Sequence, residues 1–204
     1  MSEPRSIVVL TAGTSAPSSS RRLGDRLAAA AVAGLASRGV QAVVEVVEVR
    51  DVALDVATAT LTRYPSPALT RALAAVSEAD GVVAVSPIFN ASFSGLFKSF
   101  VDLLEPAALT GRPVLVAATG GSGRHSLVLD HALRPLFTYL HALVLPTGVY
   151  AARADWAGDA GALVERIDRA GEELAGAVAA TTPRDRTDGS DFDSDLEDLL
   201  RSLD

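Results

Sequence analysis

The sequence predicts an α/β protein built on a doubly wound parallel sheet, with helices covering both faces. Short β-branched runs alternate along the chain with longer segments of helical periodicity, which is typical of this class. The run at residues 82–85 is apolar at every position, as a strand buried on both faces requires. The chain has 204 residues, which is long enough for one such domain and a short appendage.

The expected elements can be placed in order along the chain. The apolar runs that we expect to form strands are 7–10, 43–49, 82–85, 114–118 and 142–145. The segments that we expect to form helices are 20–38, 66–79, 94–105, 125–140 and 156–180. Five strands alternating with five helices match the flavodoxin-like order 2-1-3-4-5, whereas a longer Rossmann sheet would need a sixth strand.

We expect one domain over residues 1–181, followed by a separate segment, 182–204. This segment contains eight acidic residues and three arginines, so it carries −5 of the net charge of −7. Its beginning is polar and typical of a linker. A short helix would then place five apolar residues on one face: Phe192, Leu196, Leu199, Leu200 and Leu203. We expect this helix to dock on its own domain or on a neighbouring protomer, with docking of a partner protein as the alternative.

Composition excludes several classes of function. The chain has no cysteine, which excludes disulfides, iron–sulfur clusters and thiol redox chemistry, so any redox activity must reside on a bound cofactor. His125, His131 and His141 do not have the spacing of a zinc site. Residues 1–181 carry a net charge of only −2, which offers no basic face for nucleic acid. Because no apolar run is long enough to span a membrane and residues 1–10 show no signal-peptide pattern, we expect a soluble cytoplasmic protein.

The loop after the first expected strand, residues 11–21, is the most informative part of the sequence. It is rich in small and hydroxyl residues and leads into an alanine-rich helix, whose first N–H groups and nearby hydroxyls can donate to phosphate oxygens. It lacks the patterns of a nucleoside-triphosphate loop and of a dinucleotide turn. The loop therefore predicts a site for a terminal monophosphate, with a serine-rich helix cap that binds nothing as the alternative. The candidate residues are Thr11, Gly13, Thr14, Ser15, Ser18, Ser19 and Ser20.

Two further loops should reach the same crevice, because ligands bind such sheets beyond the carboxyl ends of the strands, near the switch in strand order. The first offers an apolar surface beside polar groups, which suits a flat ring system with an amide edge: Pro87, Ile88, Phe89 and Asn90. In the second, glycines permit close approach to a planar ligand: Thr119, Gly120, Gly121 and Ser122. A turn with an Asn cap, or positive φ at the glycines, would explain these loops without a ligand.

A serine-hydrolase interpretation of the third loop fails on its spacing. Ser122 and His125 could belong to a catalytic triad with an aspartate. The nucleophile elbow Gly-x-Ser-x-Gly is not met, however, because Arg124 occupies the position of the last glycine. Arg124 could instead bind the phosphates of a second nucleotide, with a solvated arginine as the alternative.

Two long segments, 87–102 and 118–135, resemble the NAD(P)H-dependent FMN reductase family, and the likeness runs from Ile7 to about Trp156. It is closest to reductases that supply reduced flavin to two-component, luciferase-like monooxygenases such as the sulfonate-desulfonating systems. The resemblance implies a flavodoxin-like fold, FMN with NADPH or NADH, and hydride transfer from the nicotinamide to flavin N5. It also implies roles for the loops. Thr11, Ser18, Ser19 and Ser20 would bind the FMN phosphate, while residues 87–90 and 119–122 would contact the isoalloxazine.

We expect no catalytic side chain, because the cofactors carry this reaction and the protein orients them. Reduced FMN would be released or passed to a partner monooxygenase. The alternatives are a quinone or azo-compound reductase with tightly bound FMN, and a flavodoxin-like electron carrier without a nicotinamide site. We also expect a homodimer or homotetramer, since the expected helices 94–105 and 125–140 are apolar around more of their circumference than one sheet face can cover.

Overall fold

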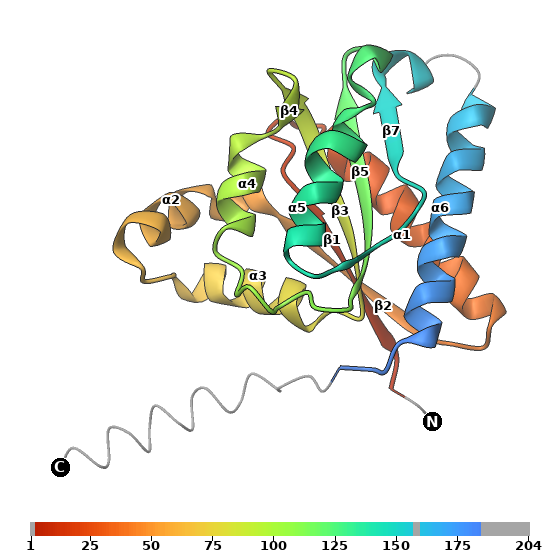
Figure 1. Ribbon diagram of the computed structural model, residues 1–204, viewed down its shortest axis with the longest axis horizontal. Helices are drawn as coiled ribbons and strands as arrows, with labels where there is room; N and C mark the ends of the chain where they lie inside the picture. The colour runs from red at the N-terminus through yellow and green to blue at the C-terminus, as the bar shows by residue number, and fades with distance from the viewer. Residues whose placement is uncertain (1–2, 157–159, 185–204) are drawn as a thin grey trace.

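The computed structural model describes residues 3–156 and 160–184 (Figure 1). In this part of the chain one sheet has the strand path β2-β1-β3-β5-β6, and every pairing along this path is parallel. β7 continues the fifth position beside β5, so the predicted order 2-1-3-4-5 is confirmed. The strands are β1 (Arg5–Thr11), β2 (Ala42–Glu48), β3 (Gly81–Phe89), β4 (Ser92–Phe93), β5 (Pro113–Gly120), β6 (Leu143–Val144) and β7 (Val149–Ala152).

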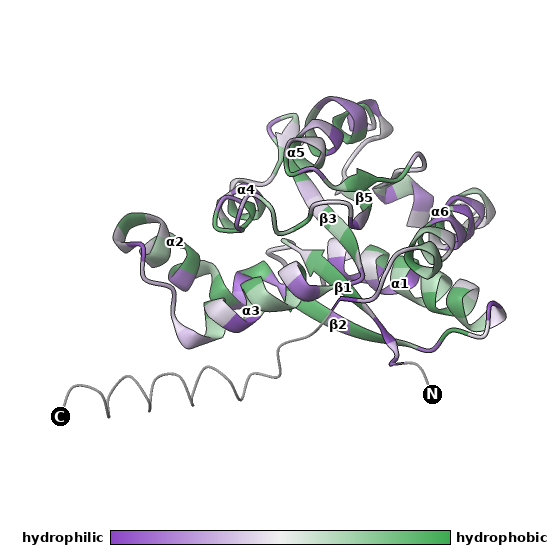
Figure 2. Ribbon diagram, turned by 60° about the horizontal axis from the view of Figure 1, so that its bottom comes forward, coloured by the Kyte–Doolittle hydropathy of each residue, from purple (hydrophilic) through white to green (hydrophobic). Residues whose placement is uncertain are grey.

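Helices cover both faces of the sheet, as predicted (Figure 1). They are α1 (Ser19–Ser37), α2 (Ala53–Thr62), α3 (Pro67–Glu78), α4 (Gly95–Val101), α5 (Arg134–Tyr139) and α6 (Ala160–Ala180). α1 and α6 pack side by side on one face, where Leu23, Leu27 and Leu174 are fully buried. The other helices enclose a second core that contains Phe97 and Phe137. Figure 2 shows the strands in apolar colours between helices that carry both apolar and polar residues.

The fifth strand position is divided, and the sequence predicted only its first part. β6 coincides with the expected strand 142–145, and Leu145 N–H still donates to the Val114 carbonyl at 3.0 Å. Pro146 then offers no N–H for the ladder. Pairing with β5 resumes at β7, which was not predicted because it has only four residues. This short strand matters for function, because it delivers the segment after it to the carboxyl end of the sheet.

Three helical predictions need correction. The expected helix 94–105 is α-helical only as far as Val101, after which the chain continues in tighter turns to Pro106. The expected helix 125–140 consists of a 3₁₀ turn η2 (Gly123–His125), a π-helical segment η3 (Leu129–Leu133) and α5. Residues 49–62 form the 3₁₀ turn η1 (Val49–Val52) and α2, which were missed because Val and Thr have low helix propensity. Among the described helices, none combines the length and apolar character of a membrane span.

The end of the described chain is held at the edge of the sheet opposite the strand carboxyl ends. The Asp80 carboxylate accepts from the backbone N–H groups of Ser6 at 2.8 Å and Arg184 at 3.1 Å, and from the Arg5 guanidinium at 3.2 Å. The Arg184 guanidinium donates to the Ala108 carbonyl at 2.7 Å. Residues up to 184 are therefore anchored to the domain. The remainder of the expected linker and the expected C-terminal helix, 185–204, lie outside the described residues.

Candidate functional site

A cavity of about 600 Å³ lies beyond the carboxyl ends of the parallel strands, where a doubly wound sheet binds its ligands. The loops after β1, β3 and β5 all contribute to its wall, as the topology predicted. Most of the predicted site residues line it: Gly13, Thr14, Ser15, Ser18, Ser19, Ser20, Pro87, Ile88, Phe89, Thr119, Gly120 and Gly121. Thr11, Asn90 and Ser122 do not.

The start of α1 forms one end of the cavity. Ser18 is the N-cap of this helix, and its Oγ accepts from the Arg21 N–H at 3.2 Å. Within the described residues, the N–H groups of Ser19 and Ser20 make no hydrogen bond, so they remain available as donors. Gly13 makes room for the cap, because a Cβ there would lie 2.0 Å from Ser18 Oγ. This end of the cavity can therefore bind an anion with neutral donors.

A buried hydroxyl pair joins two of the loops. Ser20 Oγ and Thr119 Oγ1 lie 2.8 Å apart, and both residues are buried. The pair links the first turn of α1 to the end of β5. It fixes the distance between the anion-binding end of the cavity and the loop after β5.

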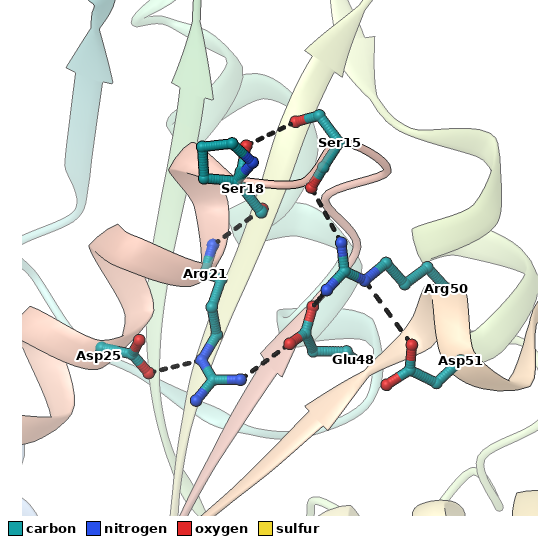
Figure 3. A network of polar contacts seen from close by, with 8 residues as sticks. Ser15, Ser18, Arg21, Asp25, Glu48, Arg50 and Asp51 are labelled. Carbon is teal, nitrogen blue, oxygen red and sulfur yellow. Dashed lines mark hydrogen bonds and ion pairs between the residues drawn. The ribbon is translucent and has the colours of Figure 1, made fainter.

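A network of charged side chains holds the loop between β1 and α1 in place (Figure 3). Arg50 Nη1 donates to the Ser15 carbonyl at 2.9 Å, and Arg50 Nη2 lies 2.8 Å from Glu48 Oε2. The other Glu48 oxygen accepts from Arg21 Nη1 at 2.8 Å. Arg21 Nε also donates to Asp25 at 2.7 Å, and this bond is the main cause that raises the pKa of Arg21. Sequence reasoning did not find this network, because its members come from α1, β2 and η1.

The end of β3, which leads into the β3–β4 hairpin, adds apolar surface to the cavity wall. Phe89 lies at the end of β3 and is half exposed. Asn90 and Ala91 follow with φ of 48° and 69°, so they make the two-residue turn of the hairpin. The alternative of an Asn helix cap is therefore wrong. Ser94 caps α4 instead, with its Oγ accepting from the Phe97 N–H at 3.1 Å.

The two glycines after β5 have different roles. A Cβ on Gly120 would lie 2.2 Å from Tyr150 Oη, so Gly120 is required by a neighbouring side chain rather than by a ligand. A Cβ on Gly121 would meet no atom within 4 Å, as expected for backbone that borders open space. Neither glycine has a positive φ, so that alternative explanation is wrong. Tyr150 Oη donates to the Ser122 carbonyl at 2.7 Å, and Ser122 Oγ accepts from the Arg124 N–H at 3.3 Å.

Local structure accounts for two of the three predicted residues outside the wall, Asn90 and Ser122. Asn90 is a turn residue, and Ser122 caps the turn that begins η2. Thr11 is 1% exposed in β1, and its hydroxyl has no hydrogen-bond partner among the described residues. A direct contact of these three residues with a ligand stays a prediction.

Four residues of the wall were missed by sequence reasoning: Arg22, Ala151, Arg153 and Trp156. Three of them follow from the undetected β7 and the 3₁₀ turn η4 (Arg153–Trp156). Arg22 could have been found, because it lies four residues after Ser18 and three after Ser19, on the same face of α1. With these additions the wall combines hydroxyl donors, an apolar surface and two arginines. This combination suits a phosphate ester joined to a flat aromatic system.

Comparison with known proteins agrees with this chemistry. Residues 5–157 match the family described as NADPH-dependent FMN reductase. The chain is 39% identical over 175 residues to NADH-dependent FMN reductase SfnE of Pseudomonas putida, which covers 84% of this chain and 91% of the relative. It is 41% identical over 159 residues to an FMN reductase (NADPH) of Pseudomonas aeruginosa, covering 76% of this chain and 81% of the relative.

Solved structures support the same relationship. An oxidoreductase from Corynebacterium diphtheriae superimposes with a TM-score of 0.85 and 44% identity, covering 89% of this chain and 100% of that chain. An apo NADH:FMN oxidoreductase gives a TM-score of 0.73 and 26% identity, covering 93% of this chain and 99% of that chain. A flavodoxin, WrbA-like protein from Agrobacterium tumefaciens superimposes with a TM-score of 0.61 and 15% identity, covering 88% of this chain and 100% of that chain. At this identity it supports the fold alone.

Proposed function

Because this chain belongs to the NADPH-dependent FMN reductase family and is an NAD(P)H:flavin oxidoreductase, we propose that the cavity beyond β1, β3 and β5 is its FMN site. The observation that carries the proposal is one cavity whose wall combines neutral phosphate donors with an apolar surface. When bound, FMN supplies the redox chemistry by accepting a hydride from the nicotinamide of NADH or NADPH.

The first turn of α1 would hold the phosphate. Its unbonded N–H groups at Ser19 and Ser20 and the hydroxyls of Ser18 and Ser19 can all donate to phosphate oxygens. Thr14 and Ser15 complete this end of the wall. Arg50 restrains the loop through the Ser15 carbonyl, so the donors are ordered before a ligand arrives. Such preorganisation favours binding because less freedom is lost on association.

The loops after β3 and β5 would hold the ring system. Pro87, Ile88 and Phe89 provide apolar contact, and the open backbone at Gly121 permits close approach of a planar group. The protein's contribution is to orient the two cofactors and keep water from the reacting atoms. No side chain of the described wall is a carboxylate, a histidine or a lysine, which fits a site that positions cofactors.

A steady-state assay tests this proposal directly. Oxidation of NADH and of NADPH is followed at 340 nm with and without added FMN, FAD and riboflavin. We expect oxidation that depends on FMN, with one nicotinamide preferred. FMN that co-purifies at full occupancy would favour a quinone or azo-compound reductase, and absence of NAD(P)H oxidation would favour an electron carrier.

Reduced FMN is proposed to leave for a partner monooxygenase. The resemblance to two-component reductases supports this idea, and the half-exposed Phe89 is consistent with a ring site that opens to solvent. The segment 185–204 is one candidate for the contact with that partner.

Truncation after Arg184 tests the role of that segment. Arg184 must be kept, because it bonds to Asp80 and Ala108. If the segment contacts the partner, the truncated protein should reduce free FMN nearly as well as the full chain and support less coupled oxygenase turnover. Loss of the oligomeric state or of flavin binding would instead identify the segment as a structural clasp and contradict the docking role.

A homodimer or homotetramer is proposed on the basis of exposed apolar side chains. The segment 94–105 does not supply them as expected, because Phe97, Phe100 and Leu104 are buried within the domain. Three of the exposed side chains lie on and after α2, where Leu54, Leu61 and Tyr64 are each more than four-fifths exposed. Leu127 and Tyr139 add exposed apolar surface at the two ends of the η3–α5 region. Surfaces of this kind normally mark an interface. Light scattering at micromolar concentration should give at least twice the mass of one chain, and a monomer would contradict the proposal.

A further inference from the structure

Arg22 lies in the wall of the cavity with its guanidinium over a tryptophan ring. Its Cζ is 4.4 Å from the centre of the Trp156 ring, and both residues line the cavity. A guanidinium at this distance over an indole makes a cation–π interaction, which favours one orientation of the long arginine side chain. Arg26, one turn further along α1, lies 5.4 Å from the same ring centre but does not line the cavity.

The charge of Arg22 is not compensated by any described carboxylate. Among the described residues, no carboxylate lies within 4.0 Å of its guanidinium, and the same is true of Arg153 in the same wall. The neighbouring Arg21 is different, since Asp25 and Glu48 neutralise it. None of the described residues that line the cavity has an acidic side chain. The cavity therefore presents uncompensated positive charge to a ligand.

Arg22 lies on the side of α1 that carries the hydroxyl donors, and it lines the same cavity. Residues three and four apart are neighbours on a helix surface, so Arg22 shares the face of α1 that carries Ser18 and Ser19. Those donors are neutral, whereas a phosphate monoester carries about −1.5 to −2 charges at pH 7. A guanidinium is the usual partner for such an oxyanion, because it donates two parallel hydrogen bonds.

We propose that Arg22, positioned by Trp156, is the cation of this site and binds a phosphate ester, that of the flavin. This inference rests on the proposed FMN site. Trp156 acts as a positioning residue that holds the guanidinium toward the first turn of α1. The nicotinamide nucleotide also carries phosphates, so the experiment must separate the two sources of the same chemistry.

The test compares Arg22→Ala with the matched variant Arg26→Ala, which removes the same charge from the same helix outside the cavity. Trp156 is the only tryptophan of the chain, so quenching of its emission reports FMN and riboflavin binding directly. At low salt we expect Arg22→Ala to weaken FMN binding about tenfold, because a charge-assisted contact is lost. Riboflavin binding should not change, and Arg26→Ala should bind both flavins normally. The loss should shrink as salt rises.

The role of Trp156 is tested through coupling. Trp156→Leu, followed by flavin fluorescence, should weaken FMN binding in the same direction as Arg22→Ala, and Trp156→Phe should restore part of it. The double variant Arg22→Ala/Trp156→Leu should bind FMN no worse than Arg22→Ala alone, since both changes remove one interaction. Additive losses, or an equal loss for riboflavin, would show that the tryptophan only packs and would overturn its positioning role.

Three further results distinguish binding of the flavin from binding of the nicotinamide nucleotide, and failure of this inference from failure of the proposed phosphate site. If Arg22→Ala binds FMN normally and raises KM for NADPH or NADH, the arginine serves the nicotinamide nucleotide and the flavin assignment is overturned. If Arg22→Ala has no effect while the Ser18→Ala/Ser19→Ala variant loses FMN, only this inference fails. If the unmodified protein does not distinguish FMN from riboflavin, the proposed phosphate site fails as well.

Discussion

Replacement of both Ser18 and Ser19 by alanine is expected to weaken FMN binding by roughly 5–150-fold and to leave riboflavin binding unchanged. Both hydroxyls line the cavity at the start of α1, and both can donate to a phosphate that riboflavin lacks. Titration of flavin fluorescence measures the two affinities on the same protein. Equal losses for FMN and riboflavin would contradict the assignment of this end of the cavity to phosphate.

A matched control is needed because Ser18 also caps α1. Its Oγ accepts from the Arg21 N–H at 3.2 Å, and loss of such a cap costs about 1 kcal/mol of stability. Ser66 caps α3 in the same way, with its Oγ accepting from the Leu69 N–H at 3.2 Å, and it does not line the cavity. Ser66→Ala should therefore show a similar loss of stability with unchanged affinity for both flavins.

Gly120→Ala is expected to destabilise the protein by about 1–3 kcal/mol and to weaken flavin binding. The new Cβ would lie 2.2 Å from Tyr150 Oη, which is bonded to the Ser122 carbonyl and cannot move without breaking that bond. Burial raises the pKa of Tyr150, with a smaller contribution from Asp155, so the phenol stays protonated and able to donate. Thermal unfolding and FMN titration measure the two effects.

Three companion variants test the cause. Tyr150→Phe alone should cost about 1 kcal/mol, because the Ser122 carbonyl loses its donor. In the Gly120→Ala background the same change removes the clashing oxygen, so the double variant should be more stable than Gly120→Ala. Gly121→Ala should leave stability unchanged and weaken only flavin binding, since its Cβ meets no protein atom within 4 Å. Additive losses in the double variant would refute the clash.

The sequence by itself determined the features that depend on neighbours along the chain. Apolar runs identified all five sheet positions, the fifth only in its first part, and the strand order followed from their alternation with helices. The hydroxyl loop before α1 and the two long motif segments indicated the family, which the comparisons confirm. Most of the cavity wall followed from the same local signals, because parallel strands bring their carboxyl ends to one edge.

Only the tertiary structure decided how distant residues meet in the site. Arg22 and Trp156 are 134 positions apart, and their contact depends on β7, a strand of four residues with no clear periodic signal. Gly120 resembled a ligand-facing glycine, but the hydroxyl of Tyr150 occupies its space. The Arg50 contact with the Ser15 carbonyl likewise joins separate elements. Periodicity reports which face of an element is buried, whereas packing between elements determines which side chains face each other.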